Sequence, residues 1–315
     1  MTRAETSDGL NDRPAHRTID HGRGRHACLV WDGPSPDAPV LHFAHANGFN
    51  GGTYRRLLGP LATQATIYAC DMRGHGATDM PADPETHRSW LLHRDDLIAL
   101  LEVVSREAGG RPLVLAGHSM GATSSVLAAL ARPDLVRSLV LLDPVMIPRR
   151  MIRWYRFLAL FGRAPAPPPI AQGAEKRRAV FADREAMVER YHGRGAFTTW
   201  PRGVVEDYVV HGTKDRDDGQ VELACAPAWE AANFRVAAAH DYWPHLRGLR
   251  CPVTLLRGTI ASTCAEPQAR AFTARVPQTR DRAVDGATHF LPMDHVEEAR
   301  TALLKALTDD PLERS

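Results

Sequence analysis

Short, continuously apolar segments alternate with amphipathic segments along the first half of the chain. Residues 39–44, 66–70, 112–116 and 138–142 have the length and composition of buried strands. Between them, residues 87–108 repeat apolar side chains at helical spacing. Parallel strands that are covered on both faces have this uninterrupted apolar character, because neither face meets water. The pattern predicts an α/β protein with a mostly parallel central sheet flanked by helices.

The alternation stops after residue 144 and resumes with the apolar segment 252–257. We therefore expect one core domain made of residues 25–144 and 246–315, interrupted by a helical insert at 145–245. Residues 1–24 are polar and lack any period. They are predicted to form a flexible N-terminal tail.

Charge and composition exclude several classes of protein. The 315 residues carry 39 Lys+Arg against 37 Asp+Glu, without the basic excess of a nucleic-acid-binding protein. No run approaches the roughly 18–20 apolar residues that a membrane helix needs. We expect no nucleic-acid partner and no stable membrane insertion.

The cysteines argue against a disulfide framework or a zinc site, because their number is odd and no C-x-x-C occurs. They are Cys28, Cys70, Cys225, Cys251 and Cys264. We expect Cys70 and Cys251, which border apolar segments, to act as small buried side chains. The first 25 residues also lack the apolar core of a secretory signal, so the expected location is cytoplasmic.

One motif carries a specific chemistry. The sequence G-H-S-M-G at residues 117–121 stands between the strand-like segment 112–116 and a helical segment that starts near residue 120. A sharp strand-to-helix turn requires small neighbours, exposes the Ser119 hydroxyl and leaves the Met120 N–H free at a helix N-terminus. Ser119 is the candidate nucleophile. The alternative is that Ser119 only caps the helix.

With this motif in place, the chain resembles the α/β-hydrolase fold family over about residues 27–310. The resemblance rests on motifs in the family's order: His45-Ala46-Asn47-Gly48-Phe49, Asp71-Met72-Arg73-Gly74-His75-Gly76, G-H-S-M-G, Leu142-Asp143-Pro144 and Gly286-Ala287-Thr288-His289-Phe290. It implies an α/β-hydrolase fold, a serine hydrolase of the type with a helical cap, and a cap at 145–245, after strand 6.

The resemblance also implies roles for two loops. His289 is expected to be the base, rather than a histidine of a surface loop or its neighbour His295. In relatives, the residue after H-G supplies the second oxyanion N–H. This position maps to Asn47, with Gly48 as the fallback.

The acid departs from the commoner family pattern. Family members usually carry it in the loop that corresponds to residues 258–264, which has no carboxylate here. Asp143, 24 residues after Ser119, is the first candidate, because some relatives use that strand end. Glu266 is the alternative, and a site without an acid is the third possibility.

The candidate substrate pocket is aromatic, and no cofactor or metal is expected. The residues considered for the pocket are Phe49, His118, Trp154, Trp200 and Trp229. His42 and His45 have no carboxylate or H-E-x-x-H motif beside them to suggest a metal. The Arg-flanked helix at 149–161 is expected to close over the site, although such a helix could also lie on a membrane surface.

These features favour a cofactor-independent hydrolase that cleaves a carboxylic ester, thioester or lactone of a small molecule through Ser119, His289 and Asp143. Carbon–carbon bond hydrolysis or acyl transfer on the same scaffold is the alternative. A non-catalytic ligand-binding protein is the second alternative. The expected state is a monomer or homodimer.

Overall fold

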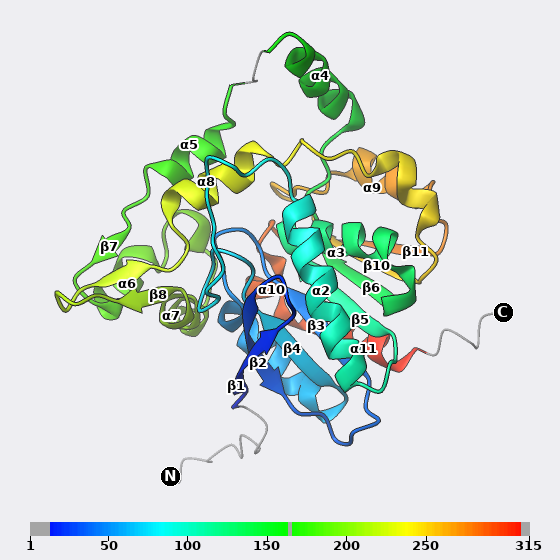
Figure 1. Ribbon diagram of the computed structural model, residues 1–315, viewed down its shortest axis with the longest axis horizontal. Coiled ribbons are helices and arrows are strands. Elements are labelled where there is room, and N and C mark those ends of the chain that lie inside the picture. Colours follow the sequence, from blue (N-terminus) through cyan, green and yellow to red (C-terminus); the bar gives the residue numbers. More distant parts are fainter. Residues whose placement is uncertain (1–12, 163–165, 310–315) are drawn as a thin grey trace.

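A computed structural model describes residues 13–162 and 166–309 (Figure 1). Its main sheet has eight strands in the order β1-β2-β4-β3-β5-β6-β10-β11. The pairs β1–β2 and β2–β4 are antiparallel, and the other neighbours are parallel. The strands are β1 (Ala15–Asp20), β2 (Arg25–Trp31), β3 (Val40–Ala44), β4 (Thr66–Cys70), β5 (Leu113–His118), β6 (Val136–Leu142), β10 (Val253–Gly258) and β11 (Thr279–Val284). The predicted fold class is confirmed.

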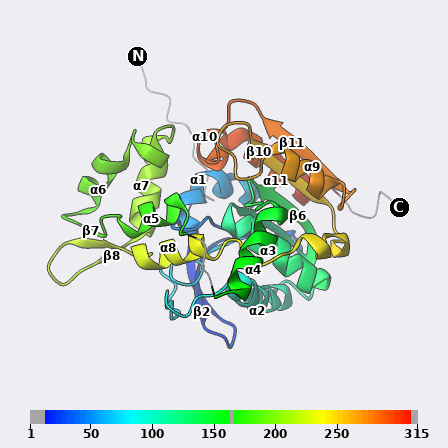
Figure 2. The same cartoon turned by 90° about the horizontal axis from the view of Figure 1, so that it is seen from above.

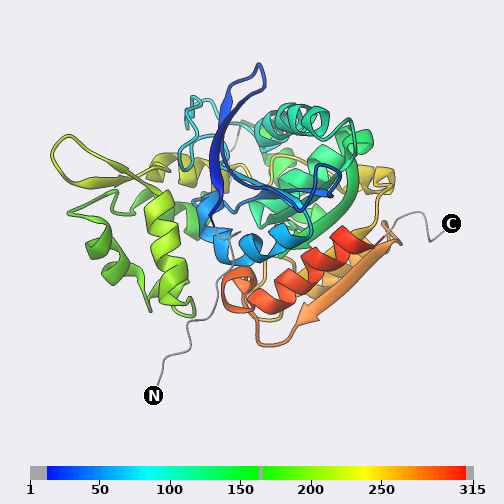
Figure 3. The same cartoon turned by 90° about the horizontal axis from the view of Figure 1, so that it is seen from below.

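Helices cover both faces of this sheet. Buried side chains of α2, α3 and α9 pack in one apolar cluster, and those of α1 and α11 pack in another on the opposite face. Figure 3 shows α2 (green-cyan) and α11 (red) on opposite sides of the sheet. The helices are α1 (Arg55–Leu58), α2 (Leu91–Glu107), α3 (Met120–Ala131), α9 (Glu266–Thr273), α10 (Leu291–Asp294) and α11 (Val296–Thr308). Short 3-10 helices are η1 (Gly51–Tyr54), η2 (Gly59–Thr63), η3 (Pro133–Leu135), η4 (Gly195–Phe197) and η5 (Trp243–Gly248).

The chain leaves the main sheet after β6 and returns to it at β10. The intervening segment, called the insert here, lies largely to one side of the sheet, with α4 apart from its other helices (Figures 1 and 2). It contains α4 (Arg149–Leu160), α5 (Pro169–Glu175), α6 (Arg184–Tyr191), α7 (Arg202–His211) and α8 (Pro227–Arg235). It also contains a small antiparallel sheet of β7 (Val180–Phe181), β9 (Val221–Leu223) and β8 (Thr213–Asp215). These strands were not expected, because two or three residues are too few to show a period.

The N-terminal prediction needs a correction. Residues 15–20 are not part of a flexible tail but form β1, which pairs along its whole length with β2. Most of its side chains are exposed, so an apolar pattern could not reveal this edge strand. The rest of the predicted tail, as far as residue 12, lies outside the described residues.

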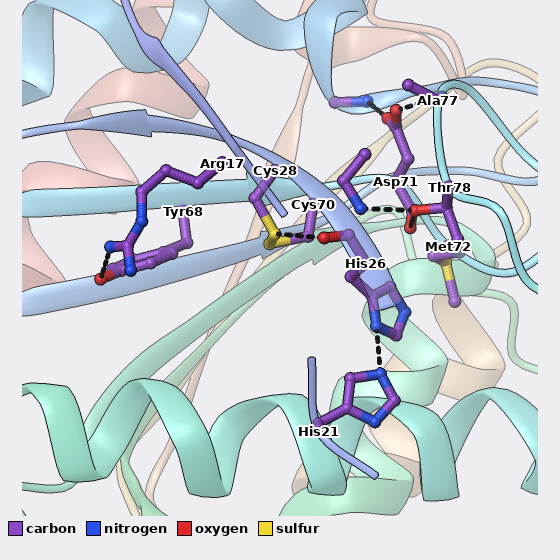
Figure 4. The surroundings of a disulfide bond; sticks show 12 residues. Arg17, His21, His26, Cys28, Tyr68, Cys70, Asp71, Met72, Ala77 and Thr78 are labelled. Atoms are coloured by element: carbon purple, nitrogen blue, oxygen red, sulfur yellow. Dashed lines mark hydrogen bonds between the residues drawn. A yellow bond between two sulfur atoms is a disulfide. The ribbon is translucent and has the colours of Figure 1, made fainter. Parts of the chain in front are cut away.

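The cysteine prediction was wrong for one pair. Cys28 and Cys70 are opposite each other in the antiparallel β2–β4 register and form a disulfide (Figure 4). The two residues are 42 positions apart, and only strand pairing brings them together. The free cysteines are Cys225, Cys251 and Cys264. The disulfide removes one of the two grounds on which a cytoplasmic location was expected.

No helix in the described part of the chain is both long and apolar enough to cross a membrane.

Reducing the Cys28–Cys70 bond, or replacing both cysteines by alanine, is expected to lower the free energy of unfolding by roughly 4 kcal/mol, because the bond restricts the unfolded chain. Urea unfolding with and without reductant measures this change. The control Cys251→Ala should keep the full effect of the reductant. Five reactive thiols in the unreduced, denatured protein would contradict the pairing.

Buried neutral histidines are a second feature of the core. Burial is the main cause that lowers the pKa of seven of them from 6.5 to about 3 or 4. They are His26, His42, His45, His75, His93, His118 and His240. Below pH 6.5 the unfolded chain binds protons that the folded chain does not, so stability falls as the pH falls. Asp71, whose pKa burial raises to about 6, opposes this trend, as do Asp207 and Glu230, whose pKa values burial also raises.

His42 offers a test, because neither of its ring nitrogens has a hydrogen-bond partner among the described residues. Between pH 7 and pH 5, the free energy of unfolding should fall by about 2 kcal/mol less in His42→Leu than in the parent protein. The reason is that the pKa of His42 is about 4 in the folded chain and 6.5 in the unfolded chain. Urea unfolding at both pH values measures the difference. His192→Gln, at an exposed ring, is the control. An equal loss in the parent and His42→Leu would show that His42 does not contribute.

Candidate active site

Ser119 lies at the sharp turn between β5 and α3. Its backbone has φ 55° and ψ −119°, a left-handed conformation that non-glycine residues rarely adopt. The turn is tight enough to require glycine on both sides. A Cβ at Gly117 would lie 2.7 Å from the Ala122 nitrogen, and one at Gly121 would lie 2.2 Å from the Ala44 oxygen. The sequence motif therefore folds as the strained strand–turn–helix that was predicted.

Ser119, His289 and Asp143 form a continuous hydrogen-bonded row. His289 Nε2 lies 3.0 Å from Ser119 Oγ, and its Nδ1 lies 2.6 Å from Asp143 Oδ2. Since a carboxylate only accepts, Nδ1–H donates to Asp143, and Nε2 is left to accept the serine proton. The arrangement can remove a proton from Ser119 and stabilise the resulting imidazolium.

Asp143 is fully buried and held by the loop that lacks the usual acid. Its Oδ1 accepts from Gly258 N (3.0 Å) and Ser262 Oγ (2.6 Å), and its Oδ2 also accepts from Thr263 N (2.9 Å). Burial alone would raise the pKa of this carboxyl. The hydrogen bond and charge of His289, together with the other donors, hold the pKa below its usual range.

The two rival residues lie elsewhere. Glu266 is exposed at the N-terminus of α9, where it pairs with Arg270 rather than with a histidine. His295 stands at the start of α11, and its Nδ1 lies 2.9 Å from Asp294 Oδ1. Neither contacts Ser119 or His289 through a hydrogen bond.

The loop at residues 45–50, called the oxyanion loop here, follows β3. Ala46 O accepts from Phe49 N (3.1 Å) and from His45 Nδ1 (2.7 Å). The Ala46 C=O and the Asn47 N–H belong to the same peptide group, and in a trans peptide they point in opposite directions. The two bonds to Ala46 O therefore direct the Asn47 N–H away from Phe49 N and His45 Nδ1. This N–H has no hydrogen-bond partner among the described residues. Asn47 therefore offers a free donor.

Gly48, the fallback donor, is already occupied. Its N–H donates to His75 Nε2 (3.0 Å), while His75 Nδ1–H donates to Arg73 O (2.9 Å). Burial is the main cause that lowers the pKa of His75 to about 3, so the ring is neutral and accepts at Nε2. Of the two loop positions considered, Asn47 is the one with an available N–H.

Met120 is the first residue of α3, where the first N–H groups of a helix have no partner within the helix. The close approach of Gly121 to the Ala44 and His45 oxygens brings this helix start against the beginning of the oxyanion loop. Two N–H groups, from Met120 and Asn47, are thus carried by segments in direct contact.

Tyr54, which the sequence did not single out, connects the oxyanion loop to the end of β5 and, through it, to the loop that carries His289. Tyr54 OH accepts from Ala46 N (3.1 Å) and donates to His118 Nδ1 (2.8 Å). His118 Nε2–H then donates to His289 O (2.8 Å). Burial is the main cause that lowers the pKa of His118 to about 3, which keeps this neutral form. Tyr54 had no sequence signal, because a buried tyrosine looks like any other core residue.

The five pocket candidates do not gather in one place. Phe49 packs on Trp200 (ring centroids 5.4 Å apart), and both contact the ring of Phe290, which follows His289. His118 is fully buried between Tyr54 and the main chain of His289. Trp229 is buried against the loop that follows β4, where its Nε1 donates to Arg73 O.

Trp154 stands apart from the other four. It lies on α4, 55% exposed, and stacks on Phe157. Phe157 on the same helix and Phe161 just after it are also exposed. Ile152 and Tyr155 pack against the core, so the exposed rings do not close over the site in this structure.

Among the described residues, no group of three or more His, Cys, Asp or Glu is placed to hold a metal ion. His45 is engaged by Ala46 O and by Met72 N, which donates to its Nε2 (2.8 Å). Its ring therefore holds the oxyanion loop in place.

Comparisons with known proteins give the family of the chain. The model of the Alpha/beta hydrolase family matches residues 43–302. The chain is 30% identical over 272 residues to the 2-(acetamidomethylene)succinate hydrolase of Mesorhizobium japonicum, covering 86% of this chain and 87% of that protein. It is 35% identical over 114 residues to the lipase LipV of Mycobacterium tuberculosis, covering 36% of this chain and 40% of the lipase.

Among solved structures, the fold is similar to a crystal structure of E-2-(acetamidomethylene)succinate hydrolase, with a TM-score of 0.74 and 24% identity. That likeness covers 94% of this chain and 100% of the other. The family match over most of the chain and the Mesorhizobium relative lead to one conclusion: the chain belongs to the alpha/beta hydrolase family.

Proposed function

We propose that this protein is a cofactor-independent serine hydrolase that cleaves a carboxylic ester, thioester or lactone through an acyl-enzyme. The observation that carries the proposal is the row Ser119–His289–Asp143, with contacts of 3.0 and 2.6 Å. The family membership and the hydrolase activity named for its relatives support it.

The proposed reaction has two steps. Ser119 Oγ attacks the substrate carbonyl carbon while its proton passes to His289 Nε2, and this proton then leaves with the alcohol or thiol. A water molecule then attacks the acyl carbonyl carbon while its proton passes to His289. His289 returns this proton to Ser119 Oγ as the carboxylic acid product leaves. The Met120 and Asn47 N–H groups hold the oxyanion in both steps.

Asp143 has a supporting role in this mechanism. Its carboxylate keeps the proton of neutral His289 on Nδ1 and stabilises the imidazolium that forms during each step. Four neighbouring contacts fix the carboxylate, so it needs no reorganisation as charge develops.

We assign the insert as a cap and the Phe49–Trp200 surface as part of an apolar acyl or alcohol pocket. Both rings contact Phe290, next to the base, so a substrate group beside them would lie near the reacting carbonyl.

A second substrate class is favoured by the Mesorhizobium relative, whose name describes an acetamido group on a succinate skeleton. Attack by Ser119 on an amide carbonyl would use the same residues. Hydrolysis of a small acylamino acid is therefore the second candidate. Acyl transfer, which the name of the relative ethanol acetyltransferase 1 describes, and carbon–carbon cleavage are the further alternatives on the same residues.

Labelling with a fluorophosphonate tests the nucleophile. The parent protein is expected to be labelled, Ser119→Ala to lose labelling fully, and His289→Ala to lose at least about 10³-fold in rate, because the hydroxyl then has no base. Mass spectrometry of the labelled peptide measures the site. Labelling of Ser119→Ala at the parent's rate would refute the catalytic role.

The acid is tested by comparing Asp143→Asn with Glu266→Gln. Asp143→Asn should lower kcat about 10³–10⁴-fold, because the amide cannot stabilise the imidazolium. Glu266→Gln should leave kcat unchanged, since Glu266 is exposed and pairs with Arg270. Steady-state hydrolysis of p-nitrophenyl acetate, with a melting curve for each variant, measures both. The reverse pattern would show that Glu266 is the acid.

A further inference from the structure

A half-buried guanidinium joins several elements of the insert. Arg177 follows α5, and its Nη1 donates to Glu230 Oε2 on α8 (2.6 Å). Its Nη2 donates to Tyr208 OH on α7 (2.8 Å) and to Tyr191 OH on α6 (3.2 Å). The Arg177 and Glu230 side chains are 21% and 9% exposed. We call these four residues the Arg177 cluster.

Two members of the cluster contact the oxyanion loop. Tyr208 OH, which accepts from Arg177, donates its own proton to Gly48 O (3.3 Å). A Cβ at Gly48 would lie 2.6 Å from Glu230 Oε1, so the carboxylate packs directly on the Gly48 Cα. The main-chain oxygen of Glu230 accepts from Asn47 Nδ2 (2.9 Å). The Asn47–Gly48 segment is therefore held by the insert on one side and by His75 on the other.

Stability alone is a weak reason for such an arrangement. A buried ion pair contributes little net stability, because the desolvation of both charges offsets their attraction. Losing one partner is costly, since the other charge is left buried. Burial raises the pKa of Glu230, and Arg177 opposes that shift by stabilising the charged form. What the cluster does provide is a fixed position for Gly48, beside the free N–H of Asn47.

We propose that Arg177 is a positioning residue for catalysis: through Glu230 and Tyr208 it fixes Gly48 and thereby the direction of the Asn47 N–H toward the oxyanion. The proposal rests on the proposed function, because it assumes that Asn47 holds an oxyanion. It makes the oxyanion site dependent on the folded insert, since Arg177, Tyr208 and Glu230 all belong to the insert.

Arg177→Met removes the guanidinium and keeps most of the stem. The kcat of this variant for p-nitrophenyl acetate is expected to fall about 10²-fold, while KM changes less than about threefold. The reason is that a misdirected Asn47 N–H loses its hydrogen bond to the oxyanion, which forms mainly in the transition state. Arg177→Lys should recover part of kcat, since an ammonium can pair with Glu230 but lacks the planar donors for both tyrosines. A parent-like kcat in Arg177→Met would overturn the proposal.

Arg202→Met is the matched control. Arg202 also belongs to the insert and also pairs with carboxylates, Glu185, Glu189 and Glu206, but on the exposed surface. The Arg202→Met variant should keep kcat within about twofold of the parent value. An equal loss of kcat in both variants would show a general effect of removing an arginine from the insert, and would also overturn the proposal.

The double variant Arg177→Met/Glu230→Met separates positioning from charge burial. Removing both charges is expected to raise the melting temperature above that of Arg177→Met, because no unpaired carboxylate remains buried. The kcat should stay low, since Gly48 has still lost its support. Recovery of kcat together with stability would assign the whole effect to the unpaired charge and refute the positioning role.

Amide hydrogen exchange gives a readout that needs no turnover. Peptides covering residues 45–50 should exchange faster in Arg177→Met than in the parent, while β5 peptides and the Arg202→Met protein stay unchanged. If the parent and Ser119→Ala have equal esterase activity, the proposed function fails. The exchange result then still decides whether Arg177 holds the loop. Equal exchange at 45–50 in the parent and Arg177→Met would contradict the inference.

Discussion

The organisation of the site depends on the buried carboxylate of Asp143. It lies at the end of β6 and accepts hydrogen bonds from the loop after β10 and from His289 in the loop after β11. These are three neighbouring strands of the sheet. An unpaired carboxylate at this depth would be strongly destabilising, so each donor must be in place. That requirement fixes both loops relative to Ser119.

A second set of contacts fixes the oxyanion loop through neutral groups. His45, His75 and Tyr54 each bind a backbone N–H or C=O of this loop or its neighbour. Burial is the main cause that lowers the pKa of both histidines to about 3, so their acceptor nitrogens stay free of protons at neutral pH. The same burial that makes these rings suitable acceptors makes the fold sensitive to acid.

The insert contacts the loops of the candidate site directly. Glu230, Tyr208 and Trp229 reach from its helices to the loops that follow β3 and β4. In contrast, Trp154 on α4 is exposed, although its place on an apolar helix face made it a candidate for the pocket. Spacing identifies an apolar face but does not identify what covers it.

The sequence by itself determined the parallel sheet, the strained turn at Ser119 and the order of the loops, because these follow from local period and from steric limits on a few residues. It also named Asp143 and Glu266 as candidates for the acid and left a site without an acid open. Only the tertiary structure places Asp143, and not Glu266, against His289, since that contact depends on which strand ends meet. The edge strand β1 was hidden because most of its side chains are exposed and show no apolar pattern. The Cys28–Cys70 bond and the Tyr54–His118 hydrogen bond were hidden for the same reason as the acid. Each joins residues that are distant along the chain, and strand register and packing alone bring them together.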